Sequence, residues 1–472
     1  MKNFLLISGG NILRQLATFA GQLYVVSRIS SASFGELTFA FSLYFMLTGL
    51  ADFGTRLHCW RSVLQQPIAS RLSYAGVLWW RRLGLVTVIV IPINVIIYLV
   101  ASGMTATLLH LYTLGILFNQ VAFDWYLLSL NKTPRLFLFN ASSGILYLLL
   151  LVATVHNPDD VYWVPIAFAL SYAIPGTALL AGHLRRAART AFRNAYPSSV
   201  AQLPRDSYEL SFYDILQRVY SMFIFVVAWR FYNEALLGDF RVAHLIYAFA
   251  STLAIYMAAG LFNKSYQEFA TRGYSEQLQR GTAALLLLVP PLSVAGALLA
   301  PAFLRLALMD TAAASAVTGA SGALTLLLAG LTLPVLANFW REILVSSNNA
   351  RLSATSYAAT IGSASLLLVL YHPMAGPEYL ASVLLIGELV GLSCIALLIR
   401  RSLWPPGAWR LFLLAAGFSL LTGLVLLLLT RLAPATPEWD QTVLPGAAFA
   451  LLYTVYILAL RRHSSFFGPR LR

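Results

Sequence analysis

Long apolar runs recur along the whole chain, separated by glycine, proline, asparagine or charged residues. The hydrocarbon core of a bilayer takes about 20 residues of helix, so each run of that length predicts one membrane-spanning helix. This pattern predicts an all-α, polytopic membrane protein. The chain holds fourteen such runs, at about 4–28, 34–55, 83–102, 105–128, 136–155, 161–182, 211–229, 242–263, 282–304, 318–340, 353–371, 379–399, 411–430 and 442–460.

Basic residues alternate between the segments that join these runs. The eight segments on one side, including both termini, carry 25 Lys or Arg residues and five acids, whereas the loops on the other side carry four basic residues and eight acids. Lys and Arg are retained on the cytoplasmic side of membrane proteins. We therefore expect both termini in the cytoplasm. The net charge of +14 then reports topology, and we expect no nucleic-acid partner.

The composition agrees with a membrane protein, because 59% of the residues are hydrophobic and only 11% are charged. Soluble domains are about a quarter charged, so a soluble enzyme is excluded. The chain contains no nucleotide-binding, serine-hydrolase or zinc-protease motif. Its two cysteines, Cys59 and Cys394, are far apart and are expected to be buried thiols. We expect no enzyme activity, no metal and no cofactor.

An offset of 203 residues aligns two parts of the chain. It pairs Gly35 with Gly238 and Tyr44 with Tyr247, and it places Arg14 and Gln15 on Gln217 and Arg218. Transporters are often built from such internal repeats. We predict two pseudo-symmetric six-helix bundles of parallel orientation followed by two further helices. The predicted parts are a bundle at 1–183, a basic cytoplasmic linker that contacts membrane lipids at 184–210, a second bundle at 211–400, and helices thirteen and fourteen with a basic tail at 401–472.

Two arginines, Arg14 and Arg218, lie at similar depths in the first and seventh runs. A charge inside a bilayer is costly and therefore faces protein or water. Guanidinium groups hold phosphate through charge-assisted hydrogen bonds, so these residues predict an anionic, phosphate-bearing cargo. We assign Gln15 and Arg28 to the same site. Two alternatives are that Arg218 pairs with Asp214 one turn away and that Arg28 only reaches an interface.

Four other residues are candidates for contact with cargo sugars or for ion coupling: Asp124, Trp125, Asp52 and Glu388. An aromatic ring beside a carboxylate suits a sugar face, although Trp125 equally suits an interfacial aromatic belt. Asp52 lies near a run end, where it could also reach the interface. We interpret Asn338 and Arg341, near the end of the tenth run, as a cytoplasmic gate or, alternatively, as a boundary cluster.

Several stretches of the sequence resemble the Wzx-type lipid-linked oligosaccharide flippases. These proteins belong to the multidrug/oligosaccharidyl-lipid/polysaccharide exporter superfamily, which also contains multidrug extruders and peptidoglycan lipid flippases. The resemblance is carried by the residues 11–15, 33–36, 50–54, Asp124-Trp125-Tyr126, Asn131-Lys132, 157–160, Tyr162, Pro165, Ser171-Tyr172 and Pro175-Gly176.

The resemblance implies two bundles that alternate access to a central cationic cavity in the bacterial inner membrane. The cargo would be a polyprenyl-diphosphate-linked oligosaccharide for O-antigen or polysaccharide assembly, held by Arg14 and Arg218. The family implies proton or sodium coupling without ATP, and partnership with polysaccharide polymerases or glycosyltransferases. We expect a monomer. A multidrug exporter is the main alternative, but two buried arginines would repel cationic drugs.

Overall fold

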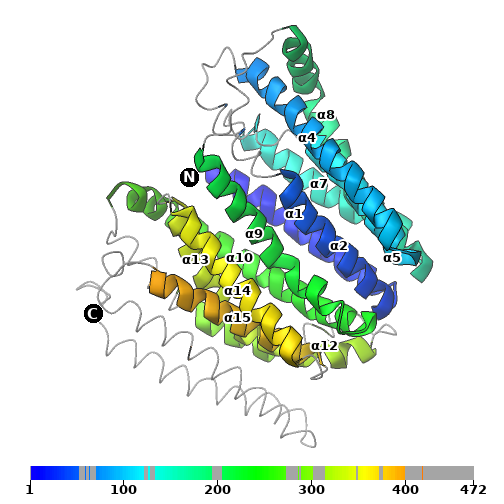
Figure 1. Cartoon of the computed structure of the whole chain (residues 1–472), viewed down its shortest axis with the longest axis vertical. Coiled ribbons are helices and arrows are strands. Elements are labelled where there is room, and N and C mark those ends of the chain that lie inside the picture. Colours follow the sequence, from blue (N-terminus) through cyan, green and yellow to red (C-terminus); the bar gives the residue numbers. More distant parts are fainter. Residues whose placement is uncertain are drawn as a thin grey trace, which may run out of the picture. The chain divides into compact units, whose positions relative to one another are not determined.

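Every regular element in the described part of the chain is a helix (Figure 1), which confirms the all-α prediction. By length and composition, seven of these helices can cross a membrane, or eight when one bent pair is counted as a single span. The chain is therefore a multi-pass membrane protein. Apart from Gly417, the predicted spans at 411–430 and 442–460 lie outside the described residues. The computed structural model describes residues 2–52, 59, 63, 71–121, 126–127, 133–193, 205–272, 285, 289–300, 304, 314–346, 349–371, 376–398 and 417.

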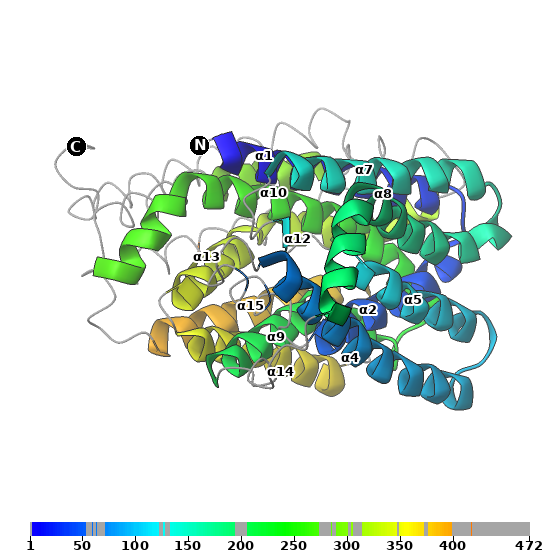
Figure 2. The ribbon, with the colours of Figure 1, turned by 90° about the horizontal axis from the view of Figure 1, so that it is seen from above.

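The chain divides into two compact units, Met1–Arg230 and Phe231–Arg472. In the first unit α1 packs along α7, α8 contacts α4, α5 and α7, and α2 contacts α9. Figure 2 shows α4 and α5 side by side. The helices of this unit are α1 (Lys2–Val26), α2 (Ser31–Asp52), α4 (Arg71–Val100), α5 (Gly103–Val121), α7 (Thr133–Thr154), the short 3-10 helix η1 (Pro158–Tyr162), α8 (Trp163–Arg193) and α9 (Arg205–Ala228).

In the second unit α14 and α15 run side by side (yellow and orange in Figure 1), and α10 packs against α12 and α13. The described helices of this unit are α10 (Glu234–Arg272), α12 (Ala314–Ala329), α13 (Thr332–Ser346), α14 (Ala350–Tyr371) and α15 (Pro377–Leu398). The domain boundaries expected from the sequence stay a prediction.

The predicted span at 318–340 is bent, because α12 and α13 meet at an angle of 49°. Pro334 has no N–H to donate to the carbonyl of Gly330. That carbonyl instead accepts from the amide of Leu333 at 3.0 Å, over three residues rather than four. Gly330 also favours the break, because a Cβ there would collide with the side chain of Leu385. The chain therefore bends at Gly330.

The 203-residue offset also relates helix starts and burial. It places the start of α2 at Ser31 on the start of α10 at Glu234. Burial repeats as well, since the pairs Ala40 and Ala243, and Tyr44 and Tyr247, are all buried. Repeated burial at paired positions is what an internal repeat requires, because each copy of the repeat uses the same helix face for its core.

The outer surface of α4 is apolar. In an apolar 18-residue window of its span Tyr74–Val100, only 17% of the residues are buried inside the protein. In water such a surface would be unfavourable, whereas contact with lipid chains costs nothing. We therefore assign this face of α4 to the lipid. Its large exposed side chains are Val88, Ile91, Val95, Ile96, Tyr98, Leu99 and Val100.

Candidate functional site

Arg14 lies on the part of α1 that packs most closely against α7. A Cβ on Gly144 of α7 would lie 2.6 Å from the Cα of Arg14, so glycine is required for this approach. The half-buried guanidinium donates a hydrogen bond from Nη1 to the hydroxyl of Tyr172 at 3.2 Å and lies 6.0 Å from the centre of that ring. Within the described residues Arg14 has no carboxylate partner. Its charge is thus available to an anion.

Arg218 lies in a cluster of charged side chains from α2, α4 and α9, which we call the Asp52 cluster. Asp52 bridges two arginines, with Oδ1 2.9 Å from Nη2 of Arg82 and Oδ2 3.4 Å from Nη2 of Arg218. Arg218 also contacts Asp214 through Nε at 3.1 Å and Thr48 through Nη1 at 3.3 Å. The alternative predicted for Arg218, an ion pair with Asp214, is therefore present. The cluster consists of Thr48, Asp52, Arg82, Asp214 and Arg218.

Local sequence explains how this cluster forms. Asp52 closes α2, and Thr48 and Asp52 face the same side of the helix because they are one turn apart. Gly49 gives Arg218 room to lie along α2, since a Cβ there would be 2.8 Å from the Cδ of Arg218. Asp52 is 2% exposed, so its carboxylate is enclosed by protein.

Sequence reasoning missed Arg82, because it placed this residue in a cytoplasmic loop before a span at 83–102. The structure starts α4 at Arg71 and buries Arg82 at 6% exposure, whereas the neighbouring Arg81 is exposed. The pair Arg81-Arg82 before an apolar run was a visible signal. It could not tell which of the two arginines points inward, because that depends on how α4 rotates against α2.

The other residues assigned to the diphosphate site are less enclosed. Arg28 is exposed at the end of α1, with its guanidinium 5.3 Å from the centre of the Tyr24 ring. Gln15 is half-buried. Asp124 and Trp125 lie outside the described residues. The structure thus brings Arg218 and Asp52 together, and it leaves the binding roles of Gln15 and Arg28 as predictions.

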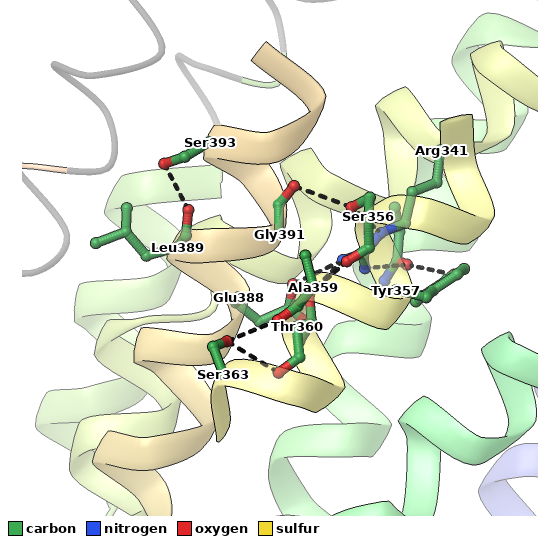
Figure 3. Close-up of polar contacts among 11 residues, drawn as sticks. Arg341, Ser356, Tyr357, Ala359, Thr360, Ser363, Glu388, Leu389, Gly391 and Ser393 are labelled. Carbon is green, nitrogen blue, oxygen red and sulfur yellow. Dashed lines mark hydrogen bonds and ion pairs between the residues drawn. The ribbon is translucent and has the colours of Figure 1, made fainter. Parts of the chain in front are cut away.

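The second unit contains a different charged group, which we call the Arg341 cluster (Figure 3). Arg341 of α13 contacts Glu388 of α15 through Nη2 at 3.4 Å, and both side chains have 0% of their surface exposed. The sequence had assigned these two residues to separate roles, a gate and an ion-coupling site. The structure joins them in one network. The cluster consists of Asn338, Arg341, Ser356, Tyr357, Thr360 and Glu388.

Polar partners surround the guanidinium of Arg341. Nε contacts Ser356 at 3.2 Å, Nη2 contacts Thr360 at 3.0 Å, and the Tyr357 ring centre lies 4.0 Å from Cζ. Ser356 in turn donates to the carbonyl of Gly391 at 2.9 Å, as Figure 3 shows. Such complete bonding is what a charge pair needs to be stable away from water.

Comparisons with known proteins identify the fold. No protein-family profile and no curated protein sequence matches the chain. Among solved structures, the lipid II flippase MurJ in an inward closed conformation is similar at a TM-score of 0.68 and 14% identity, over 99% of this chain and 100% of that one.

Two multidrug transporters are similar as well. An inward-facing multidrug resistance MATE family transporter of the MOP superfamily matches at a TM-score of 0.66 and 16% identity, over 89% of this chain and 96% of that one. A Vibrio cholerae MATE transporter matches at a TM-score of 0.60 and 15% identity, over 87% of this chain and 96% of that one. At these identities the likeness establishes the fold alone, and that fold is shared by a lipid flippase and by drug transporters.

Proposed function

We propose that this protein flips a polyprenyl-diphosphate-linked oligosaccharide from the cytoplasmic to the periplasmic leaflet by alternating access, for cell-surface polysaccharide assembly. The observation that carries the proposal is Arg14, a half-buried guanidinium on α1 whose described polar partner is the neutral hydroxyl of Tyr172. A charge held there at the cost of desolvation, without a carboxylate, fits an anionic cargo.

The MATE-like fold makes a multidrug exporter the rival proposal. A cationic drug would need an unpaired carboxylate in its site. Asp52 and Asp214 are both paired with arginine, and Glu388 is paired with Arg341. These three acids are therefore already neutralised by arginine and offer no unpaired charge to a cationic drug.

The proposal includes the bacterial inner membrane, cytoplasmic termini, a monomer, and polymerase or glycosyltransferase partners. It also includes coupling to a proton or sodium gradient. Glu388 is enclosed in the Arg341 cluster, so ion exchange at Glu388 would require that cluster to open. Asp52 would exchange an ion only by releasing Arg82 or Arg218. Asp124 is the remaining acid assigned to coupling.

The test is translocation of a fluorescent polyprenyl-diphosphate oligosaccharide by the protein reconstituted in proteoliposomes. Arg14→Ala removes a charge-assisted hydrogen-bond donor, so we expect at least about a tenfold loss of rate. Arg135→Ala, at an exposed arginine of α7, is the matched control and should transport like the wild type. Wild-type transport that Arg14→Ala leaves unchanged would refute the role of Arg14. If the wild-type protein exports a cationic dye but flips no lipid-linked sugar, the result would favour the multidrug-exporter proposal.

A further inference from the structure

Arg82 has buried hydrogen-bond donors for which the described part of the chain offers no partner. Its Nη2 contacts Asp52 at 2.9 Å, but Nε and Nη1 are buried and have no hydrogen-bond partner. These two atoms carry three of the five N–H donors of a guanidinium. Buried donors are paired in the great majority of folded proteins. Those of Arg82 therefore need an explanation.

Comparison with Arg341 shows that this protein does satisfy a structural arginine. Nε, Nη1 and Nη2 of Arg341 all have polar partners. Arg82 is almost as deeply buried, at 6% exposure, yet two of its three nitrogens are unpaired. An arginine that only stabilised the fold would be expected to resemble Arg341. The unpaired donors of Arg82 are what a binding site shows when its ligand is absent.

Asp52 holds both arginines of the cluster with one carboxylate. One oxygen contacts Arg82 and the other contacts Arg218, so both oxygens are occupied while donors of Arg82 stay unused. The cluster is accessible from the side of Arg218 and Asp214, which are 20% and 31% exposed. An anion arriving from that side would meet Arg218 first and would then compete with Asp52 for Arg82.

We propose that Arg82 and Arg218 form a binding site for a phosphate or diphosphate group, and that Asp52 occupies this site when it is empty. A diphosphate offers more acceptor oxygens than one carboxylate, and it can reach the donors of Arg82 that Asp52 leaves unpaired. The inference rests on the proposed function only in naming the source, which would be the diphosphate of the lipid-linked cargo. Free diphosphate has the same chemistry.

The test is binding of radiolabelled inorganic diphosphate to the purified full-length protein in nanodiscs of neutral lipid. Arg82→Gln should weaken binding at least about tenfold, as expected for a lost charge-assisted contact. Arg81→Gln, its exposed neighbour, should bind like the wild type. Asp52→Asn removes the internal competitor and should tighten binding by about tenfold, because it removes one nearby negative charge.

Three outcomes would overturn the inference: a wild type that binds no diphosphate, unchanged affinity in Arg82→Gln, or a loss of affinity in Asp52→Asn, which would make Asp52 a positioning residue. Arg82→Lys covers the case in which Arg82→Gln fails to fold. It keeps the charge but has fewer donors in a different geometry, so its affinity should fall, and wild-type affinity would count against the site.

Competition distinguishes the two sources of the ligand and separates this inference from the proposed function. If polyprenyl diphosphate displaces the label, and this displacement depends on Arg82, the result supports the lipid-linked cargo as the source of the ligand. A label displaced only by free diphosphate supports the site and contradicts that cargo. Transport of the oligosaccharide lipid by Arg82→Gln at the wild-type rate would sustain the proposed function and reject this site.

Discussion

The Asp52 cluster of the first unit and the Arg341 cluster of the second unit contain the same chemical groups in different surroundings. In the Arg341 cluster both charged side chains are fully enclosed, and every guanidinium nitrogen has a partner. In the Asp52 cluster Arg218 is 20% exposed, and two nitrogens of Arg82 are unpaired.

This difference separates a charge pair that holds helices together from one that can exchange partners. A fully buried pair adds little net stability, but its loss is costly because the remaining charge stays buried. A partly exposed pair is screened by solvent, so breaking it costs little. The Arg82–Asp52 pair is itself buried, with 6% and 3% of its side-chain surfaces exposed, so the contrast lies at Arg218. We therefore expect changes in the Arg341 cluster to affect folding and changes at Arg218 to affect binding.

The largest effect should come from Arg341→Met. It removes the guanidinium that pairs with the fully buried Glu388, and we expect a loss of about 3–5 kcal/mol in the free energy of unfolding. The measurement is reversible denaturation in mixed micelles, with Arg351→Met at an exposed position of α14 as the control. A loss no larger than the control's would mean that the two clusters do not differ in this way.

Gly391→Ala should have the next largest effect, because a Cβ there would collide with Oγ1 of Thr360 and would lie 2.9 Å from Nη2 of Arg341. Overpacking of this kind costs about 1–3 kcal/mol. Gly362→Ala is the matched control, since it has open space on α14. The control should keep or slightly gain stability, because alanine favours helix over glycine by up to about 1 kcal/mol. Equal melting curves for the two variants would contradict the prediction.

Gly49→Ala tests the other side of the comparison. The added Cβ pushes against Cδ of Arg218, a side chain free enough to move, so we expect less than about 1 kcal/mol of lost stability. Diphosphate binding should nevertheless weaken, because Arg218 is displaced from its place beside Asp52. Gly84→Ala, which meets open space on α4, serves as the control. A Gly49→Ala variant that is destabilised but binds diphosphate like the wild type would contradict the assignment of Arg218 to binding.

The smallest effect should come from Asp214→Asn. Asp214 and Arg218 form an (i, i+4) pair on α9 with 31% and 20% of their side-chain surfaces exposed. Such pairs contribute about 0.3–0.5 kcal/mol. The measurement is again reversible denaturation, repeated at high salt, where the difference from the wild type should vanish. A loss above about 2 kcal/mol would place this pair with the buried ones.

Much of the fold could be predicted from the sequence because a bilayer sets the length of every span. The described helices α1, α2 and α14 lie within a few residues of the predicted runs 4–28, 34–55 and 353–371. The bend at Gly330 was missed, because Pro334 sits in an otherwise apolar run and hydropathy does not register a missing N–H.

The candidate site was predicted only in part. Arg14, Arg218 and Asp52 stand out because charges are rare inside membrane spans. Arg82 was missed since its sequence context resembles a cytoplasmic helix end. Glu388 has no basic residue nearby in the sequence, and its partner Arg341 is 47 positions away.

The sequence by itself determined the membrane class, the approximate spans and the presence of charges that need partners, because hydrophobicity and charge act on each residue according to its own side chain. Only the tertiary structure decided which charge meets which. Helix rotation decides whether Arg81 or Arg82 faces inward. Helix rotation and glycines such as Gly49 and Gly391 also decide whether the nitrogens of an arginine all find hydrogen-bond partners. These are properties of contacts between distant segments, which hydropathy along the chain does not record.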